Sequence, residues 1–176
     1  TEGEDLPGAM RRANAQLWEG DPAEARETAE RALVDSRPAP SAFARSALFM
    51  ANLSYATGDI GRASEWVAAA DKAFDGYWLA DAYAGQQLAA EGDIDGSIAA
   101  LEALAKKHAE PDLIDTLVGV LLYAGEDARA ARWQARAERL WDEQLAISRD
   151  AYRLHAAEHH LDFGDPAKAL ELAHEE

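Results

Sequence analysis

The chain has 176 residues, of which 48% are hydrophobic, and this suits one domain with a continuous core rather than a disordered chain. Its 17 basic and 33 acidic residues give a net charge of −16, which repels phosphates, so nucleic acid is disfavoured as a partner. The absence of cysteine excludes disulfides and thiolate metal sites but leaves the compartment open, because cysteine-free proteins occur in the cytoplasm and in the periplasm.

The longest purely apolar stretch, residues 117–124, is far shorter than the roughly 20 residues that a membrane-spanning helix needs. The sequence therefore predicts a soluble protein without membrane insertion.

A glycine followed by an acidic residue recurs along the chain at spacings of 38, 34, 33 and 39 residues. A small residue stands five positions after each glycine, and a residue that is small in four of five cases stands seven positions before it. A glycine in a left-handed or open conformation ends one helix, and an acidic side chain after it caps the next helix. Each pair therefore predicts the turn of a helix hairpin. The pairs are Gly20-Asp21, Gly58-Asp59, Gly92-Asp93, Gly125-Glu126 and Gly164-Asp165.

Ten helices follow in chain order. Their expected ranges are 5–18, 22–34, 41–57, 60–73, 77–91, 94–108, 111–124, 127–145, 148–163 and 166–176. Pro22 and Pro166 fall at the first helical position, where a missing N–H is harmless, and Asp21 with Glu24 has capping-box spacing. We expect Ser41 to cap the third helix. The eighth helix should be longer than its counterparts, because residues 138–148 contain no glycine or proline.

This period and its small residues resemble the tetratricopeptide repeat (TPR), a helix-turn-helix unit of about 34 residues. The resemblance implies an all-α fold, a right-handed α-solenoid of five TPR-like hairpins in a single domain over 1–176. The repeats would span about 5–38, 41–75, 77–110, 111–146 and an incomplete 147–176. One departure is Gln134, which stands where the family has an apolar residue, and we expect Trp133 to fill the gap. The use of alanine and arginine is typical of a GC-rich bacterium.

In the family, the first helix of each repeat lines a concave groove that contacts partners. Carried onto this sequence, the groove positions include Asn14, Trp18, Arg45, Asn52, Tyr55 and Gln86. The amides of Asn14, Asn52 and Gln86 form a row that could bond the backbone of an extended peptide without selecting its sequence. The alternative is that they are solvated polar residues on a helix face.

Four acids, Asp112, Asp115, Glu158 and Asp162, continue the predicted groove and favour a basic partner. The alternative is that so acidic a chain places acids on any face. The remaining tryptophans, Trp66, Trp78, Trp133 and Trp141, are expected to pack between repeats.

The string His155-Ala156-Ala157-Glu158-His159 fits the H-x-x-E-H pattern of inverted zinc peptidases. Such an enzyme needs a further acidic ligand many residues downstream, and only 17 residues follow His159. His155 and His159, with His160 and Glu158, stay a candidate for binding zinc or nickel. The alternative is that these are ordinary surface histidines on an amphipathic helix. No phosphate-binding loop, nucleophile elbow or cysteine nucleophile is present, so the sequence predicts no catalytic residue and no cofactor.

The sequence therefore predicts a non-catalytic scaffold or adaptor that binds a peptide or partner protein in its groove. Two alternatives remain. The chain could be a docking or regulatory region of a larger enzyme, since its last helical pattern stops short, or a self-association module that forms a homo-oligomer through its end repeats.

Overall fold

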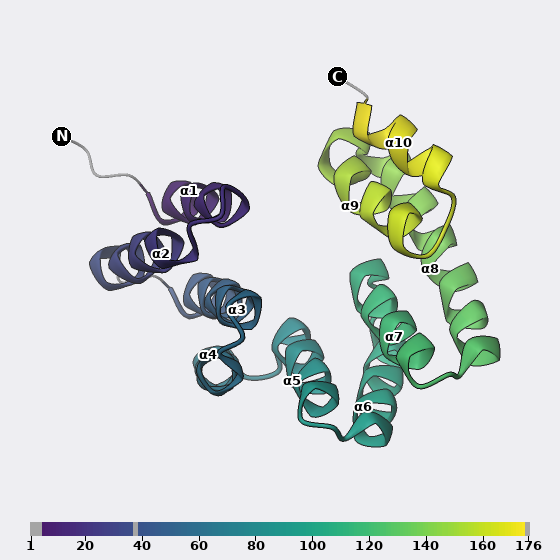
Figure 1. Cartoon of the computed structure of the whole chain (residues 1–176), viewed down its shortest axis with the longest axis horizontal. Coiled ribbons are helices and arrows are strands. Elements are labelled where there is room, and N and C mark those ends of the chain that lie inside the picture. Colours follow the sequence, from purple (N-terminus) through teal and green to yellow (C-terminus); the bar gives the residue numbers. More distant parts are fainter. Residues whose placement is uncertain (1–4, 37–38, 175–176) are drawn as a thin grey trace. The chain divides into compact units, whose positions relative to one another are not determined.

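A computed structural model describes residues 5–36 and 39–174, apart from the side chains of residues 35 and 36. These residues form ten α-helices and no strand (Figure 1). Each observed boundary lies within two residues of the predicted one, except at the end of the tenth helix, where residues 175 and 176 lie outside the described residues. The helices are α1 (Leu6–Trp18), α2 (Pro22–Ser36), α3 (Pro40–Ala56), α4 (Ile60–Ala73), α5 (Trp78–Ala90), α6 (Ile94–Lys107), α7 (Pro111–Tyr123), α8 (Asp127–Ile147), α9 (Arg149–Asp162) and α10 (Pro166–His174).

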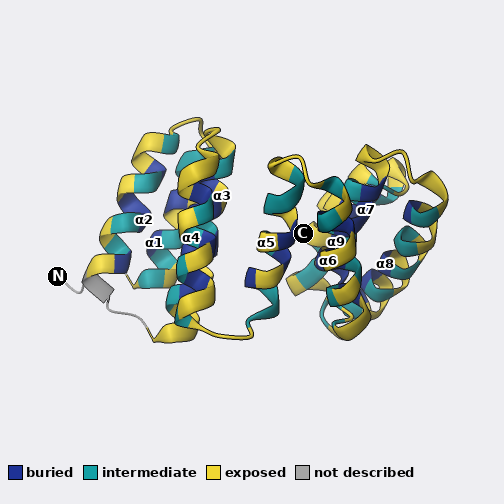
Figure 2. Cartoon of the chain, turned by 90° about the horizontal axis from the view of Figure 1, so that it is seen from below, coloured by how far each residue is buried: buried dark blue, intermediate teal, exposed yellow. Residues whose placement is uncertain are grey.

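The contacts divide the chain after Gln87 into two compact units. The first unit holds α1–α4 and most of α5, and the second holds the end of α5 with α6–α10. Within each unit the helices turn their buried residues toward neighbouring helices and their exposed residues outward (Figure 2). The assignment of all five repeats to one domain stays a prediction.

Four of the five predicted glycine turns have a left-handed backbone. The φ angles are +91° at Gly20, +75° at Gly58, +94° at Gly92 and +74° at Gly125. At each turn, the residue after the glycine donates its N–H to the carbonyl five residues before it, as Asp21 does to Gln16. This bonding satisfies carbonyls that the end of a helix would otherwise leave without partners.

Gly164 lies in the turn between α9 and α10, as predicted, but does not have this left-handed conformation. A Cβ atom at Gly164 would lie 2.5 Å from Nδ1 of His160 and 3.1 Å from its Cα. Glycine is required here because the backbone passes close to a histidine, and not because of its φ angle.

Each aspartate that follows a turn glycine caps the next helix with its side chain. The carboxylates of Asp21, Asp59 and Asp93 accept N–H bonds of 2.9, 3.1 and 2.9 Å from the third residue beyond them. Asp165 accepts one of 2.9 Å from the N–H of Ala167. Within the described chain, Glu126 makes no such bond at the start of α8. The longer glutamate side chain does not reproduce the aspartate geometry, consistent with the preference for short polar caps.

The third helix begins differently from the prediction. Its N-cap is Ala39, Pro40 occupies the first turn, and Ser41 lies inside the helix. The Ser41 cap was therefore wrong, because proline, whose fixed φ suits the first helical position, starts the helix one residue earlier. The predicted extension of α8 is confirmed, since this helix has 21 residues.

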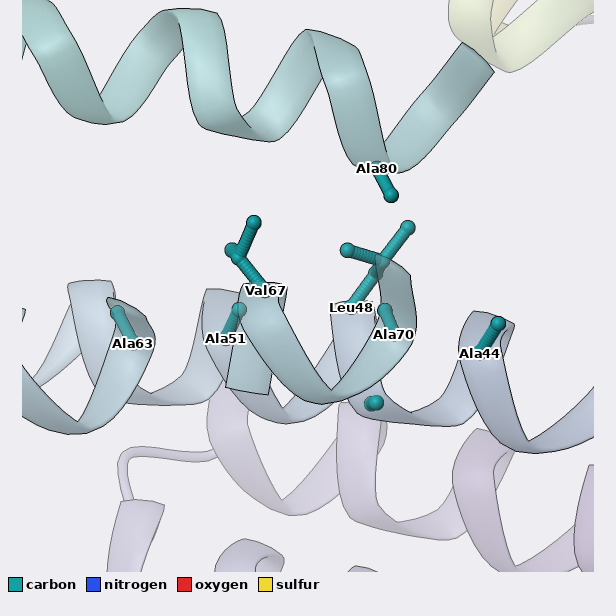
Figure 3. Close-up of a cluster of buried hydrophobic side chains, with 8 residues drawn as sticks. Ala44, Leu48, Ala51, Ala63, Val67, Ala70 and Ala80 are labelled. Atoms are coloured by element: carbon teal, nitrogen blue, oxygen red, sulfur yellow. The ribbon is translucent and has the colours of Figure 1, made fainter. Parts of the chain in front are cut away.

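The first unit contains two alanine-rich cores. One joins α1, α2 and α3 through Ala13, Ala25, Ala29, Leu33, Met50 and Leu53. The other joins α3, α4 and α5 through Ala44, Ala47, Leu48, Ala51, Ala63, Val67, Ala70 and Ala80 (Figure 3). Small side chains on facing helices let the backbones approach closely. The small residues that flank the turns are therefore a packing requirement.

The second unit has larger core residues. Leu113, Ile114, Leu117, Val118 and Leu121 make one buried face of α7. Val118, the one large residue in a position that is otherwise small, is fully buried. Trp141 on α8 and Leu172 on α10 are each 1% exposed.

The sequence suggested that Trp133 fills the apolar position at which Gln134 stands, but the structure shows otherwise. Gln134 donates from Nε2 to the backbone carbonyl of Phe163 at the end of α9. Trp133 points to α6 instead and donates from Nε1 to Oε1 of Glu102 at 3.2 Å. Burial raises the pKa of Glu102, but hydrogen bonds from Arg129 and Trp133 outweigh it and leave the pKa lowered.

The cap difference within the second unit can be measured. Asp93→Ala should lower the free energy of unfolding by about 1 kcal/mol, because it removes the acceptor of the Gly96 N–H. Glu126→Ala should change it by less than about 0.5 kcal/mol, because no cap bond is lost. Urea unfolding of both variants beside the wild type gives the comparison, and equal losses would contradict the assignment of the caps.

Candidate functional site

A cleft of about 730 Å³ opens between α1 and α3 in the first unit. Its walls are largely apolar, and Arg45 is the charged side chain among its lining residues. An apolar hollow with a few polar groups is the usual form of a site that receives a side chain. The lining residues are Leu6, Pro7, Met10, Ser41, Ala42, Arg45, Ser46 and Phe49.

The predicted amide positions continue from this cleft along the same two helices. Asn14 lies one turn beyond Met10 on α1, and Asn52 lies two turns beyond Arg45 on α3; both amides are exposed. Trp18 lies one further turn along α1 and is 82% exposed. The first unit thus presents an apolar cleft followed by exposed amides and an exposed aromatic ring.

Two other predicted groove residues lie in the same unit. Tyr55 is half-buried and packs against the α3–α4–α5 core, so its ring contributes to stability. Gln86 is exposed on α5. The sequence did not predict the cleft itself, because its depth depends on how α1 and α3 pack.

The four predicted acids all lie in the second unit, on α7 and α9, but they do not form one uniform surface. Asp112, Glu158 and Asp162 are exposed, whereas Asp115 is half-buried. Oδ2 of Asp115 accepts a 2.8 Å hydrogen bond from Nε1 of Trp141, and Oδ1 lies 2.7 Å from Nδ1 of His159. Asp115 therefore bonds inside the unit.

The pKa of Asp112 is raised above its usual value. Desolvation by neighbouring side chains is the largest cause, and the carboxylates of Asp115, Glu158 and Glu110 raise the pKa further. His155 acts in the opposite direction. A cation placed near Asp112 would relieve this repulsion.

The histidines of α9 differ from the surface histidines that the sequence suggested. His159 and His160 are 2% and 1% exposed. Because a carboxylate only accepts hydrogen bonds, the proton shared by His159 and Asp115 belongs to Nδ1 of His159. Burial lowers the pKa of His160, with Lys168 and His159 adding to the effect and Glu138 and Asp142 opposing it. The surface interpretation was wrong for these two residues because the apolar face of α9 includes them.

His155, in contrast, is exposed. Its ring stacks on Trp141 with centroids 6.2 Å apart, and its Nδ1 lies 3.4 Å from Oε2 of Glu158. His155 and His159 thus sit in different environments. Over residues 5–36 and 39–174, no group of three or more histidine, aspartate or glutamate side chains is placed to hold a metal ion.

The internal role of Asp115 leads to a direct test. Asp115→Ala should cost about 2–4 kcal/mol of unfolding free energy, because the buried donors of Trp141 and His159 lose their acceptor. Asp112→Ala, one turn away and exposed, should cost less than about 0.5 kcal/mol. Chemical unfolding monitored by tryptophan fluorescence measures both, and a loss at Asp115 no greater than that at Asp112 would refute the internal role.

Solved structures similar to this chain share its helix-hairpin architecture. The TPR-like repeats of a chain described as a kinesin light chain of Podosopora anserina match at 16% identity and a TM-score of 0.57, over 96% of this chain and 91% of that chain. Pseudomonas aeruginosa pilF matches at 15% identity and 0.54, over 95% and 72%. YrrB, described as a TPR protein with an unusual peptide-binding site, matches at 16% and 0.50, over 96% and 82%.

No protein-family model and no curated protein matches the sequence. The structural matches show the fold, which is all-α and is the helix-hairpin solenoid of TPR proteins. Among the described residues, no helix has the length and apolar character needed to cross a membrane.

Proposed function

We propose that this chain is a non-catalytic scaffold that holds a peptide or partner protein against the first helices of its hairpins. The observation that carries the proposal is the α1–α3 cleft with Asn14 and Asn52 beyond it. An apolar side chain of the partner enters the cleft, and the two amides bond to the partner's backbone as both donors and acceptors.

Similarity to a structure described as having a peptide-binding site supports this use of the fold. The acids of the second unit, Asp112, Glu158 and Asp162, favour basic segments of the partner. The raised pKa of Asp112 supports the same preference, because an approaching cation would stabilise its charged form.

The burial and hydrogen bonding of Asp115 and His159 support a non-catalytic role. This pair is the combination of side chains that most resembles an acid–base site. Both side chains are bonded or buried inside the second unit, where the pair also binds Trp141. A general base has to reach the proton that it removes, and His159 is only 2% exposed. The pair therefore fits a structural role.

The test begins with peptides selected from a random display library against the wild-type protein. Their affinity for an Asn14→Ala/Asn52→Ala variant and for an Arg45→Glu variant is then measured by fluorescence anisotropy. We expect each variant to bind about tenfold more weakly, a loss of about 1.4 kcal/mol, because hydrogen bonds or charge at the cleft are removed.

Arg132→Glu supplies the matched control, since Arg132 is exposed on α8 and lies outside the cleft. This variant should retain wild-type affinity, and circular dichroism should show that all three variants fold. Selected peptides that bind the cleft variants and the control equally well would refute the proposed site.

A further inference from the structure

Consecutive hairpins in the first unit meet through fixed positions relative to the turn glycine. Arg26, six residues after Gly20, donates to Oγ1 of Thr57 at the end of α3, at 3.3 Å. Leu48, ten residues before Gly58, packs in one core with Ala80 of α5, and Figure 3 shows the two side chains facing each other. Both residues lie on the side of their hairpin that the next hairpin covers.

The second unit uses the same position before the glycine and a different one after it. Asp115, ten residues before Gly125, reaches His159 on α9. Gln134, nine residues after Gly125, donates to the carbonyl of Phe163 at the end of α9. Leu48 and Asp115, each ten positions before a turn glycine, are therefore both covered by the first helix of the following hairpin.

Among the described residues, the corresponding positions of the α9–α10 hairpin are exposed. Leu154 lies ten residues before Gly164, and Leu170 and Ala173 lie six and nine residues after it. Leu161 lies two turns after Leu154, on the same side of α9. Leu154, Leu161 and Leu170 are 56%, 67% and 60% exposed, and Ala173 is also exposed. We call these four residues the end face.

Acidic side chains of α9 lie beside the end face. Asp150, Glu158 and Asp162 are exposed and, at helical spacing, lie next to Leu154 or Leu161. His155 lies beside Glu158, with 3.4 Å between Nδ1 and Oε2. The surface is therefore apolar at its centre with negative charge along α9.

We propose that the end face binds an amphipathic helix of a partner protein whose apolar stripe covers Leu154, Leu161 and Leu170 and whose flanks carry lysine or arginine. A helix is the expected occupant because Leu48 and Asp115, at the position of Leu154, are each covered by a helix. The acids of α9 select basic flanks.

A second copy of this chain fits less well. An isologous contact would place Asp150, Glu158 and Asp162 of one copy near the same acids of the other, on chains that each carry a net charge of −16. The end face belongs to the second unit and the α1–α3 cleft to the first, so the proposal extends the preference for basic segments without depending on the cleft.

Three synthetic helical peptides of about 18 residues test the proposal. The first has a leucine stripe with lysine flanks, the second has the same stripe with glutamate flanks, and the third has the composition of the first with its stripe scrambled. We expect the first peptide to bind the wild-type protein at least tenfold more tightly than either of the others, at physiological salt and by fluorescence anisotropy.

A Leu154→Ser/Leu161→Ser variant should lose at least tenfold in affinity for the first peptide, whereas Val34→Ser, at a side chain that is 76% exposed on α2, should retain it. Glu158→Lys/Asp162→Lys should abolish the preference for lysine over glutamate flanks. Arg45→Glu should bind the first peptide like the wild type, which separates this face from the cleft.

Three results would overturn the proposal. Equal binding of the scrambled peptide would show attraction by charge alone, and equal binding of the glutamate-flanked peptide would remove the role of the acids. Light scattering that shows a wild-type dimer, lost in the Leu154→Ser/Leu161→Ser variant, would make a second copy the occupant.

Discussion

The fold depends on one constraint: a two-helix hairpin cannot bury its apolar surface alone and needs a neighbouring hairpin to cover it. Ala13, Ala25, Ala51 and Ala63 flank the first two turns and are fully buried, which lets the helices approach closely. The glycine turns and aspartate caps set the length of each helix so that these small residues face one another. Packing between neighbouring hairpins therefore stabilises the fold.

The same constraint decides which residues remain for function. Side chains between consecutive hairpins are used for packing. Even Asp115, a carboxylate predicted to line the groove, forms hydrogen bonds inside the unit, to Trp141 and His159. Exposed positions on the first helices, such as Asn14, Asn52 and Glu158, remain available to a partner. The proposed scaffold function rests on these residual surfaces. The end face is a further packing surface that the second unit leaves exposed.

Local features were predictable from the sequence, and features that depend on packing were not. The helix ranges and the left-handed turn at Gly20 follow from residues within a few positions of each other. The turn at Gly164 was predicted, but the close approach of its backbone to the His160 ring depends on packing and was not. The groove positions could be placed on helices, but periodicity alone did not show that Asp115 turns inward or that α1 and α3 leave a cleft.

Hydrogen–deuterium exchange with and without a peptide selected against the wild-type protein tests the central claim, that the first helices of the hairpins hold the partner. The account predicts added protection in α1 and α3, where the cleft and the two asparagines lie, with α2 and α4 unchanged. Protection confined to α2 and α4, or spread evenly over the chain, would contradict it.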